Sequence, residues 1–450
     1  MARHRARRRA AGQSSIPTRM LINGIGNLLP PLSSLLIAPI LALNLGVVGR
    51  GELAAATAPY LLAVSIATLG LPESVTQAVA RFPGLSRRIL LSTSWIILLS
   101  GIVASVLLWA LAPLLSDGDA QLAEMIALAG AATAPTLLVA LLRGAASGLN
   151  AWKTVAFERI LSGVLRFVGI AGLAYAGLLT PYSAALCLAI SPVVAGFAYF
   201  ALPRQIMPPL GGAAELPGVR RQELLWYGFR VWFGSISGIL LLRIDQAVMA
   251  PLSNAYQLGL YAIAVNVSEV PLIVNSAVRE VMFASDSAEN DDNRLLAAAR
   301  ISNLICTFIG VAIASTLIFW IPVVFGSEFL PAIPTMLILI AAVVAGTPGS
   351  IAGAALSARG APELRSISLT VACVLNVLIL ILLAPWLGAV GAAVATLVGN
   401  VVASHGNIVF FQRKHGVRWT SFYGIRRSDF GLIVQTLKGI RRRKSSSSAR

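Results

Sequence analysis

The chain has 450 residues, of which 57% are hydrophobic and only 12% are charged, and its formal net charge is +17. Apolar runs of about 20 residues, the length that crosses a hydrocarbon core of about 30 Å, recur along it, which excludes a soluble globular protein. The basic residues lie in short loops and at both ends of the chain instead of on one folded face, so the charge indicates membrane topology and not nucleic-acid binding.

Twelve membrane-spanning helices are predicted in chain order. They cover residues 21–45, 53–72, 89–114, 122–142, 160–179, 182–202, 224–249, 257–278, 301–325, 329–355, 366–386 and 389–411. The predicted fold class is therefore an all-α polytopic membrane protein. The basic residues 1–20 precede the first span without a small-residue cleavage site, so we expect an uncleaved signal anchor.

The loops between the predicted spans alternate in charge. The odd-numbered loops contain a single basic residue, Arg50, whereas every even-numbered loop is basic. Short loops rich in Lys and Arg stay on the cytoplasmic side of the membrane. The pattern therefore requires an even number of spans and places both termini in the cytoplasm. The residues of the basic loops are Arg81, Arg87, Arg88, Arg143, Lys153, Arg159, Arg204, Arg220, Arg221, Arg279, Arg294, Arg300, Arg359 and Arg365.

The predicted spans form two halves. A Pro- and Gly-containing cytoplasmic linker, residues 203–223, separates a six-helix bundle at 21–202 from a second one at 224–411. The two halves contain the same residues at corresponding positions. Gly51 and Ala56 correspond to Gly259 and Ala264 at an offset of 208, and Gly148 corresponds to Gly360 at an offset of 212. Such matches indicate parallel repeats related by an axis along the membrane normal.

The basic tail at 412–450 spaces Phe430, Ile433, Leu437 and Ile440 on one helical face. We expect it to lie on the anionic inner leaflet, and a plain cytoplasmic tail is the alternative.

Four arginines lie within or close to apolar runs, where ionisable side chains usually face a protein interior or a hydrated cavity. Arg159 and Arg166 are seven residues apart and share one face of the fifth span, and Arg230 and Arg243 belong to the seventh span. Their planar, permanently charged groups match phosphate oxygens, so we expect them to bind an anionic substrate. The alternative is that Arg159, Arg166 and Arg230 extend to the headgroups at the membrane surface.

Two carboxylates lie in the seventh and eighth spans. Asp245 shares a helical face with Ser237 and Leu241, and Glu269 shares one with Ser276. Such carboxylates bind a proton or sodium ion that drives transport, pair with an arginine, or join two helices.

No residue pattern indicates a cofactor, a metal site or an enzyme. Cys187, Cys306 and Cys373 all lie inside apolar runs, and no Walker-type phosphate loop or catalytic signature is present. We therefore expect energy from an ion gradient, the membrane potential or consumption of the product.

Three stretches carry a family resemblance. They are the pair DQ at 245–246 followed by LGLYA at 258–262, the weaker LGVVGRG at 45–51, and LGAVGAAVA at 387–395. They resemble polysaccharide flippases of the Wzx type in the multidrug/oligosaccharidyl-lipid/polysaccharide (MOP) exporter superfamily, although Leu53 stands where an aromatic residue is common. The resemblance implies two six-helix bundles in a V around a central cavity, alternating access, and a polyprenyl-pyrophosphate-linked oligosaccharide or polysaccharide repeat unit as cargo.

Three other functions are weighed against this one. A cation-coupled drug exporter of the same superfamily needs acidic residues in the amino-terminal bundle, and the first, third and fifth predicted spans contain none. A membrane glycosyltransferase or polymerase usually needs a large outer loop, whereas those predicted here are short. A peptidoglycan-precursor flippase typically has two further spans. The sequence thus favours a polysaccharide flippase of the cytoplasmic membrane, with polysaccharide assembly machinery as a possible partner.

Overall fold

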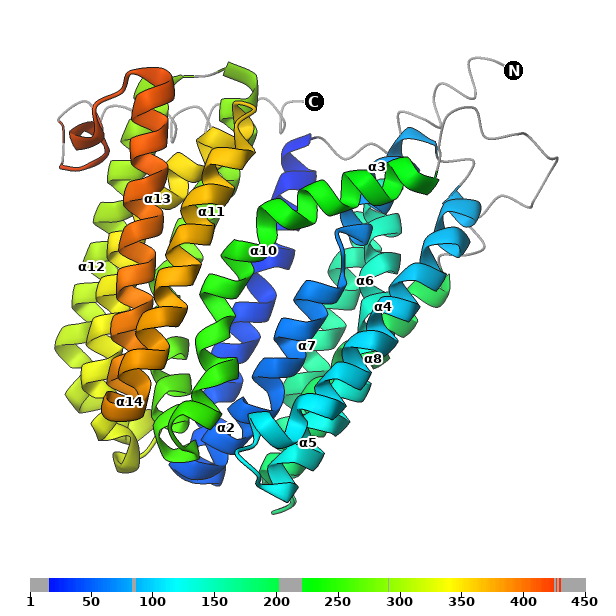
Figure 1. Cartoon of the computed structure of the whole chain (residues 1–450), viewed down its shortest axis with the longest axis vertical. Helices are drawn as coiled ribbons and strands as arrows, with labels where there is room; N and C mark the ends of the chain where they lie inside the picture. Colours follow the sequence, from blue (N-terminus) through cyan, green and yellow to red (C-terminus); the bar gives the residue numbers. More distant parts are fainter. Residues whose placement is uncertain are drawn as a thin grey trace, which may run out of the picture. The chain divides into compact units, whose positions relative to one another are not determined.

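A computed structural model describes residues 16–82, 86–201, 221–289, 291–424, 426 and 429. Within these ranges, the side chains of residues 16–32 and of parts of 221–289 lie outside the description. The described backbone is helical and contains no strand (Figure 1), which confirms the predicted all-α fold class. Its helices are α2 (Ile16–Ala67), α3 (Leu71–Arg81), α4 (Ser86–Leu115), α5 (Ala120–Ala131), α6 (Thr133–Gly148), α7 (Trp152–Tyr175), α8 (Pro181–Ala195), η2 (Gly196–Ala201), α10 (Arg221–Leu252), α11 (Ala255–Glu289), α12 (Asp292–Val324), η3 (Ser327–Ala332), α13 (Ile333–Ala358), α14 (Pro362–His415) and η4 (Trp419–Phe422).

Seven helical stretches in the described part of the chain are long and apolar enough to cross a membrane. They comprise α2 from Ser33 onward, α4, α5 with α6, α8 with η2, α12, η3 with α13, and α14. The other long helices are α7, α10 and α11, which carry the charged residues singled out in the sequence. Large apolar side chains face outward on the apolar helices, among them Trp95 and Phe319, which are 76% and 75% exposed. Lipid-facing surfaces have this character, and the chain is a multi-pass membrane protein.

The helices α2 and α14 each account for two predicted spans. A straight helix of 54 residues, the length of α14, would be about 80 Å long at about 1.5 Å per residue, more than twice a hydrocarbon core of about 30 Å. Its helical geometry breaks at Gly388, between the predicted spans 366–386 and 389–411. The corresponding break in α2 is at Gly46, between the first two predicted spans. With both helices counted twice, the long helical elements match the twelve predicted spans.

The break at Gly388 requires glycine for two reasons. Its φ of +55° is in the left-handed region, and a Cβ at this position would overlap the side chain of Gln257. The same Gln257 side chain accepts a hydrogen bond at Oε1 from the backbone N–H of Ala389, at 3.0 Å, and so caps the helical segment that follows. The motif LGAVG therefore specifies a helix reversal.

The chain separates into two compact units. Unit 1 contains residues 1–44, 59–113 and 119–232. Unit 2 contains residues 45–58, 114–118 and 233–450.

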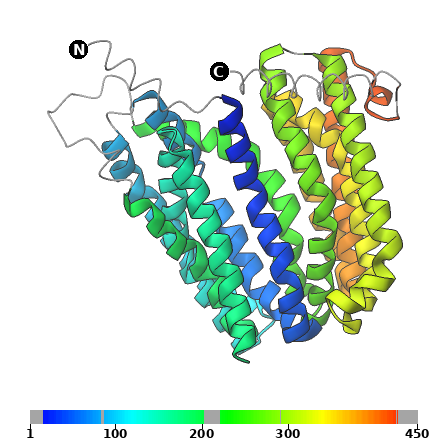
Figure 2. The same ribbon diagram turned by 180° about the vertical axis from the view of Figure 1, so that it is seen from behind.

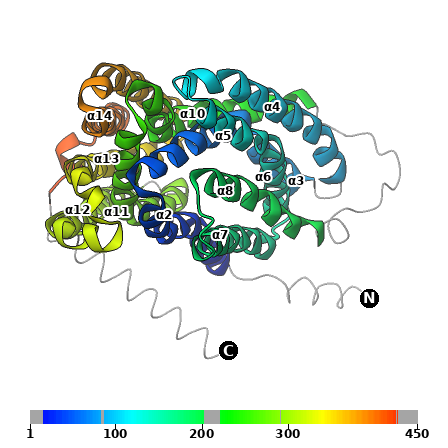
Figure 3. The same cartoon turned by 90° about the horizontal axis from the view of Figure 1, so that it is seen from below.

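In unit 1, α3 packs on α6 and α7 packs on α8 (Figure 3). The short helix α3 has no counterpart among the predicted elements, and it places Leu71 and Val75 in a core with Leu137 and Leu141 of α6. At Gly144 of α6 the helices are so close that a Cβ would overlap the backbone of α3. Small residues allow such close packing of membrane helices.

In unit 2, α11, α12 and α14 all pack on α13 (Figures 1 and 2). A buried cluster at one end of these helices joins Leu295, Ile351, Phe411 and Phe422. Because Phe422 lies beyond the end of α14, the described residues 416–422 after this helix are part of the folded unit.

Candidate functional site

A fully buried carboxylate lies in unit 1. Glu158 of α7 has 0% exposure and accepts two hydrogen bonds from Arg143 of α6, from Nε to Oε2 at 3.0 Å and from Nη2 to Oε1 at 2.9 Å. The hydroxyl of Tyr199 in η2 donates a third to Oε2, at 3.2 Å. A bidentate guanidinium and a hydroxyl compensate the charge and hydrogen-bonding demand of a buried carboxylate. These three residues are absent from the predicted site.

The position of Glu158 corrects one step of the sequence analysis. Helix α7 begins at Trp152, eight residues before the predicted fifth span, so the fifth helix does contain an acidic residue. Lys153, Glu158 and Arg159 lower the local hydropathy, which moved the predicted boundary past them. Only the pairing with Arg143, from a different helix, makes the burial of Glu158 possible.

Arg166 lies on α7 two helical turns beyond Arg159, as predicted, and both side chains are partly buried. The charge of Arg166 interacts with Glu158, Arg143 and the hydroxyl of Tyr60. Its Nε is buried without a hydrogen-bond partner among the described residues. Because Arg143 already neutralises Glu158, Arg166 carries the surplus positive charge of this cluster.

In unit 2, the buried Asp245 of α10 is held by three donors. The backbone N–H of Gln246 donates to Oδ1 at 2.8 Å, and Thr396 Oγ1 donates to Oδ2 at 3.1 Å. The hydroxyl of Tyr261 also donates to Oδ2 and lies 3.0 Å from Thr396 Oγ1. The network joins α10, α11 and α14. Tyr261 was noted as part of a sequence motif, whereas nothing in the sequence singled out Thr396.

Arg243 and Glu269 form a second charged pair in unit 2, with Nη2 and Oε1 3.7 Å apart. Their side chains are 42% and 31% exposed, so this pair is more open than Asp245. Ser237, Leu241 and Asp245, which the sequence places on one face of α10, are all buried. The side chain of Arg230, also predicted on this face, lies outside the described residues.

These arrangements are suited to binding ions. A buried carboxylate ringed by two hydroxyls and an N–H group, as at Asp245, can bind a proton or a monovalent cation. A buried guanidinium without a carboxylate of its own, as at Arg166, can bind an anion. Across the described residues, no group of three or more His, Cys, Asp and Glu side chains could hold a metal ion.

Comparison with known protein families shows which family the chain belongs to. Residues 19–283, more than half of the chain, match the family described as "Polysaccharide biosynthesis protein". The chain belongs to this polysaccharide biosynthesis protein family. No curated protein matches it.

Three solved structures that share this fold are described as transporters or flippases. An inward-facing multidrug resistance MATE family transporter of the MOP superfamily has a TM-score of 0.64 and 16% identity, covering 87% of this chain and 98% of its own. The lipid II flippase MurJ, in an inward closed conformation, has a TM-score of 0.66 and 12% identity, covering 89% of each chain. A MOP superfamily transporter from Pyrococcus furiosus has a TM-score of 0.60 and 15% identity, covering 88% and 94%.

The chain thus shares its helical fold with transporters of the MOP superfamily.

Proposed function

We propose that this protein moves a polyprenyl-pyrophosphate-linked oligosaccharide or polysaccharide repeat unit across the cytoplasmic membrane by alternating access. The observation that carries the proposal is the surplus guanidinium of Arg166. It lies in a buried cluster whose only carboxylate, among the described residues, is already paired with Arg143. A transporter of organic cations has no use for such a charge, whereas an anionic pyrophosphate does.

In this proposal the substrate-binding cations are Arg159, Arg166 and Arg230 of unit 1 and Arg243 of unit 2. Arg243 is partly exposed and only loosely paired with Glu269, so a pyrophosphate can compete for it.

Coupling to an ion gradient is assigned to the carboxylates of unit 2. Asp245 is enclosed by hydroxyls and has no arginine within hydrogen-bond distance among the described residues, so binding a proton or sodium ion would neutralise it. Glu269 pairs with Arg243 and would link the state of the carboxylates to the substrate-binding arginine.

The proposal retains the predicted topology, with both termini in the cytoplasm, bundles at 21–202 and 224–411, and a linker at 203–223. Most of that linker lies outside the described residues. The remaining proposed contacts are an anionic inner leaflet beside the basic tail and polysaccharide assembly machinery that supplies or consumes the repeat unit.

A cation-coupled drug exporter is the second candidate, and the buried Glu158 of unit 1 is the observation that favours it. An acid in the amino-terminal unit would attract an organic cation if it were available. The bidentate contact with Arg143 argues against that use, because an incoming cation must displace a guanidinium at 2.9 Å.

The test is transport by the purified protein in liposomes that contain a fluorescent polyprenyl-pyrophosphate sugar. Wild type, Arg166→Ala and Arg243→Ala are compared at equal insertion, with Arg87→Ala as the control because Arg87 is exposed at the start of α4. We expect wild type and the control to move the lipid, and both other variants to lose at least about tenfold of the rate, which corresponds to one charge-assisted contact. Extrusion of an organic cation without movement of the lipid would replace this proposal with the drug exporter.

A further inference from the structure

Arg279 and Arg365 are two like charges in unit 2 that have no part in the proposed transport path. Arg279 lies late in α11 and Arg365 lies in the first turn of α14, and both side chains are half-buried. The positive charge of Arg279 acts on Arg365. Two guanidinium groups that repel each other in a partly desolvated place cost free energy unless an anion lies near both.

Helix α13 brings Arg279 into this position. On α11, Asn275 donates from Nδ2 to Ser350 Oγ of α13, at 2.9 Å. Arg279 follows Asn275 by one turn on the same face of α11. Because both helices run in the same direction, this turn carries Arg279 to the level of Gly353 and Ser357, which follow Ser350 on α13.

Arg365 reaches the same turn of α13 from the other side. Its Cδ would lie 3.4 Å from a Cβ placed on Gly353, so its stem packs on the bare glycine backbone. Its Nη1 lies 3.5 Å from Ser357 Oγ. Ser357 thus positions Arg365 through Nη1, and the other guanidinium N–H groups do not contact Ser357.

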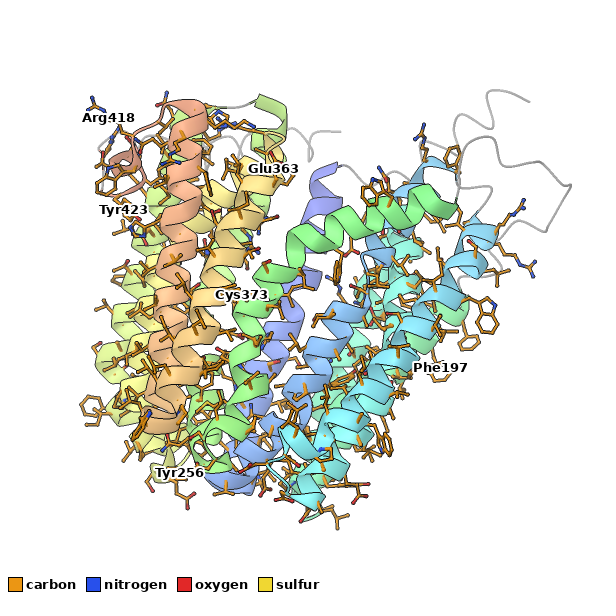
Figure 4. The ribbon with its side chains drawn as sticks, in the orientation of Figure 1. Phe197, Tyr256, Glu363, Cys373, Arg418 and Tyr423 are labelled. Atoms are coloured by element: carbon orange, nitrogen blue, oxygen red, sulfur yellow. The ribbon has the colours of Figure 1, made fainter. Side chains whose placement is uncertain are left out.

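Among the described side chains, the acids at this end of unit 2 are occupied or turned outward. Asp292 binds Arg359 at 2.6 Å, and Asp429 binds Arg300 at 2.5 Å. Glu363 is exposed and lies at the same end of the unit as Arg418, opposite Tyr256 (Figure 4). Among residues whose side chains are described, neither Arg279 nor Arg365 forms an ion pair with a carboxylate.

We propose that Arg279 and Arg365, with Ser357 as a positioning residue, bind the phosphate group of a lipid at the end of unit 2 that the predicted topology places in the cytoplasm. Two guanidinium forks match the oxygens of a phosphodiester or a pyrophosphate. The adjacent residues Val278 and Leu364 pack against one apolar cluster of unit 2, so the anion that we expect here is one carried by a lipid. The source is either a prenyl pyrophosphate, the headgroup class of the proposed cargo, or an anionic phospholipid.

Binding to the full-length protein in nanodiscs tests this site without transport. In the first arm the nanodiscs contain only phosphatidylcholine and farnesyl pyrophosphate is titrated. In the second arm phosphatidylglycerol is added instead. Binding is followed by the rise in unfolding temperature for wild type, Arg279→Gln, Arg365→Gln and the control Arg413→Gln, whose side chain is exposed in the last turn of α14.

We expect wild type and Arg413→Gln to bind alike, and Arg279→Gln and Arg365→Gln each to bind at least about tenfold more weakly, with partial recovery in Arg365→Lys. Without ligand, both Gln variants should be at least as stable as wild type, because each removes a repulsion. A response in the first arm identifies a pyrophosphate site, and a response confined to the second identifies a phospholipid site. Equal binding by all four proteins would overturn the proposal, as would an equal loss in Arg413→Gln. Because transport is not measured here, failure of this site leaves the proposed flippase activity to be judged separately.

Discussion

The backbone of Gly51 lies directly against the backbone of Gly259, its counterpart in the other sequence half. A Cβ on Gly51 would overlap the carbonyl oxygen of Ala255 and lie 3.0 Å from the nitrogen of Gly259. A Cβ on Gly259 would overlap the carbonyl oxygen of Val47 and lie 3.2 Å from the nitrogen of Gly51. The two backbones therefore meet at these glycines, and each excludes a side chain from the other.

This contact predicts that Gly51→Ala and Gly259→Ala destabilise the protein by about 1–3 kcal/mol each, the usual cost of overpacking. Gly172→Ala in α7 is the matched control, because a Cβ there meets no atom within 4 Å and alanine favours the helix. Thermal unfolding in detergent should show lower transition temperatures for the first two variants and an unchanged or higher one for the control. Equal temperatures for all three would contradict the close contact.

The Glu158–Arg143 pair predicts strong coupling in a double-mutant cycle. Arg143→Met leaves a fully buried carboxylate uncompensated and should cost about 3–5 kcal/mol. Adding Glu158→Gln should recover much of that loss, since it removes the stranded charge. Additive effects of the two substitutions on the unfolding temperature would show that the two side chains do not stabilise each other.

Asp245→Asn should leave the protein folded but abolish acceleration of transport by an imposed proton or sodium gradient. The amide keeps the size and one acceptor oxygen while it removes the charge that an ion would neutralise. Exchange of labelled substrate without a gradient should continue, which separates coupling from binding. The control is Glu363→Gln, an exposed carboxylate of the same unit. Gradient-driven transport at the wild-type rate in Asp245→Asn would remove Asp245 from the coupling mechanism.

The segment after α14 should detach from unit 2 in acid. Arg300 donates from Nε at 2.8 Å and from Nη2 at 2.5 Å to Asp429, and these hydrogen bonds lower the pKa of the Asp429 carboxyl. A carboxyl whose pKa is lowered in the folded state stabilises the protein at pH values above its pKa in the unfolded state, which is about 3.9. This stabilisation is lost as the pH falls through the lowered pKa of the folded state.

Melting curves measured as the pH is lowered from about 6 to about 3 should therefore show a larger loss of stability for wild type than for Asp429→Asn. The variant should also be less stable than wild type at pH 6, because Arg300 is then buried without its partner. Parallel pH profiles for the two proteins would exclude Asp429 as the group responsible.

The sequence by itself determined the all-α class and the approximate positions of the long helices, and it singled out the charged residues on α7, α10 and α11. The hydrocarbon thickness fixes the length of a span, and the cost of burying charge makes Arg166, Asp245 and Glu269 conspicuous. The glycine motifs also carried correct local information, since Gly388 marks a helix reversal and Gly51 and Gly259 mark a close contact.

Only the tertiary structure decided which charges meet. Glu158 was missed because its partner Arg143 lies on another helix, and hydropathy placed both near a helix end. Asp245 was found, but its donor Thr396 lies 151 residues away and is one of many hydroxyls in apolar helices. Helical periodicity assigns a residue to a face of its own helix. Packing sets the rotation and depth of the neighbouring helices, and these determine which side chain lies opposite that residue.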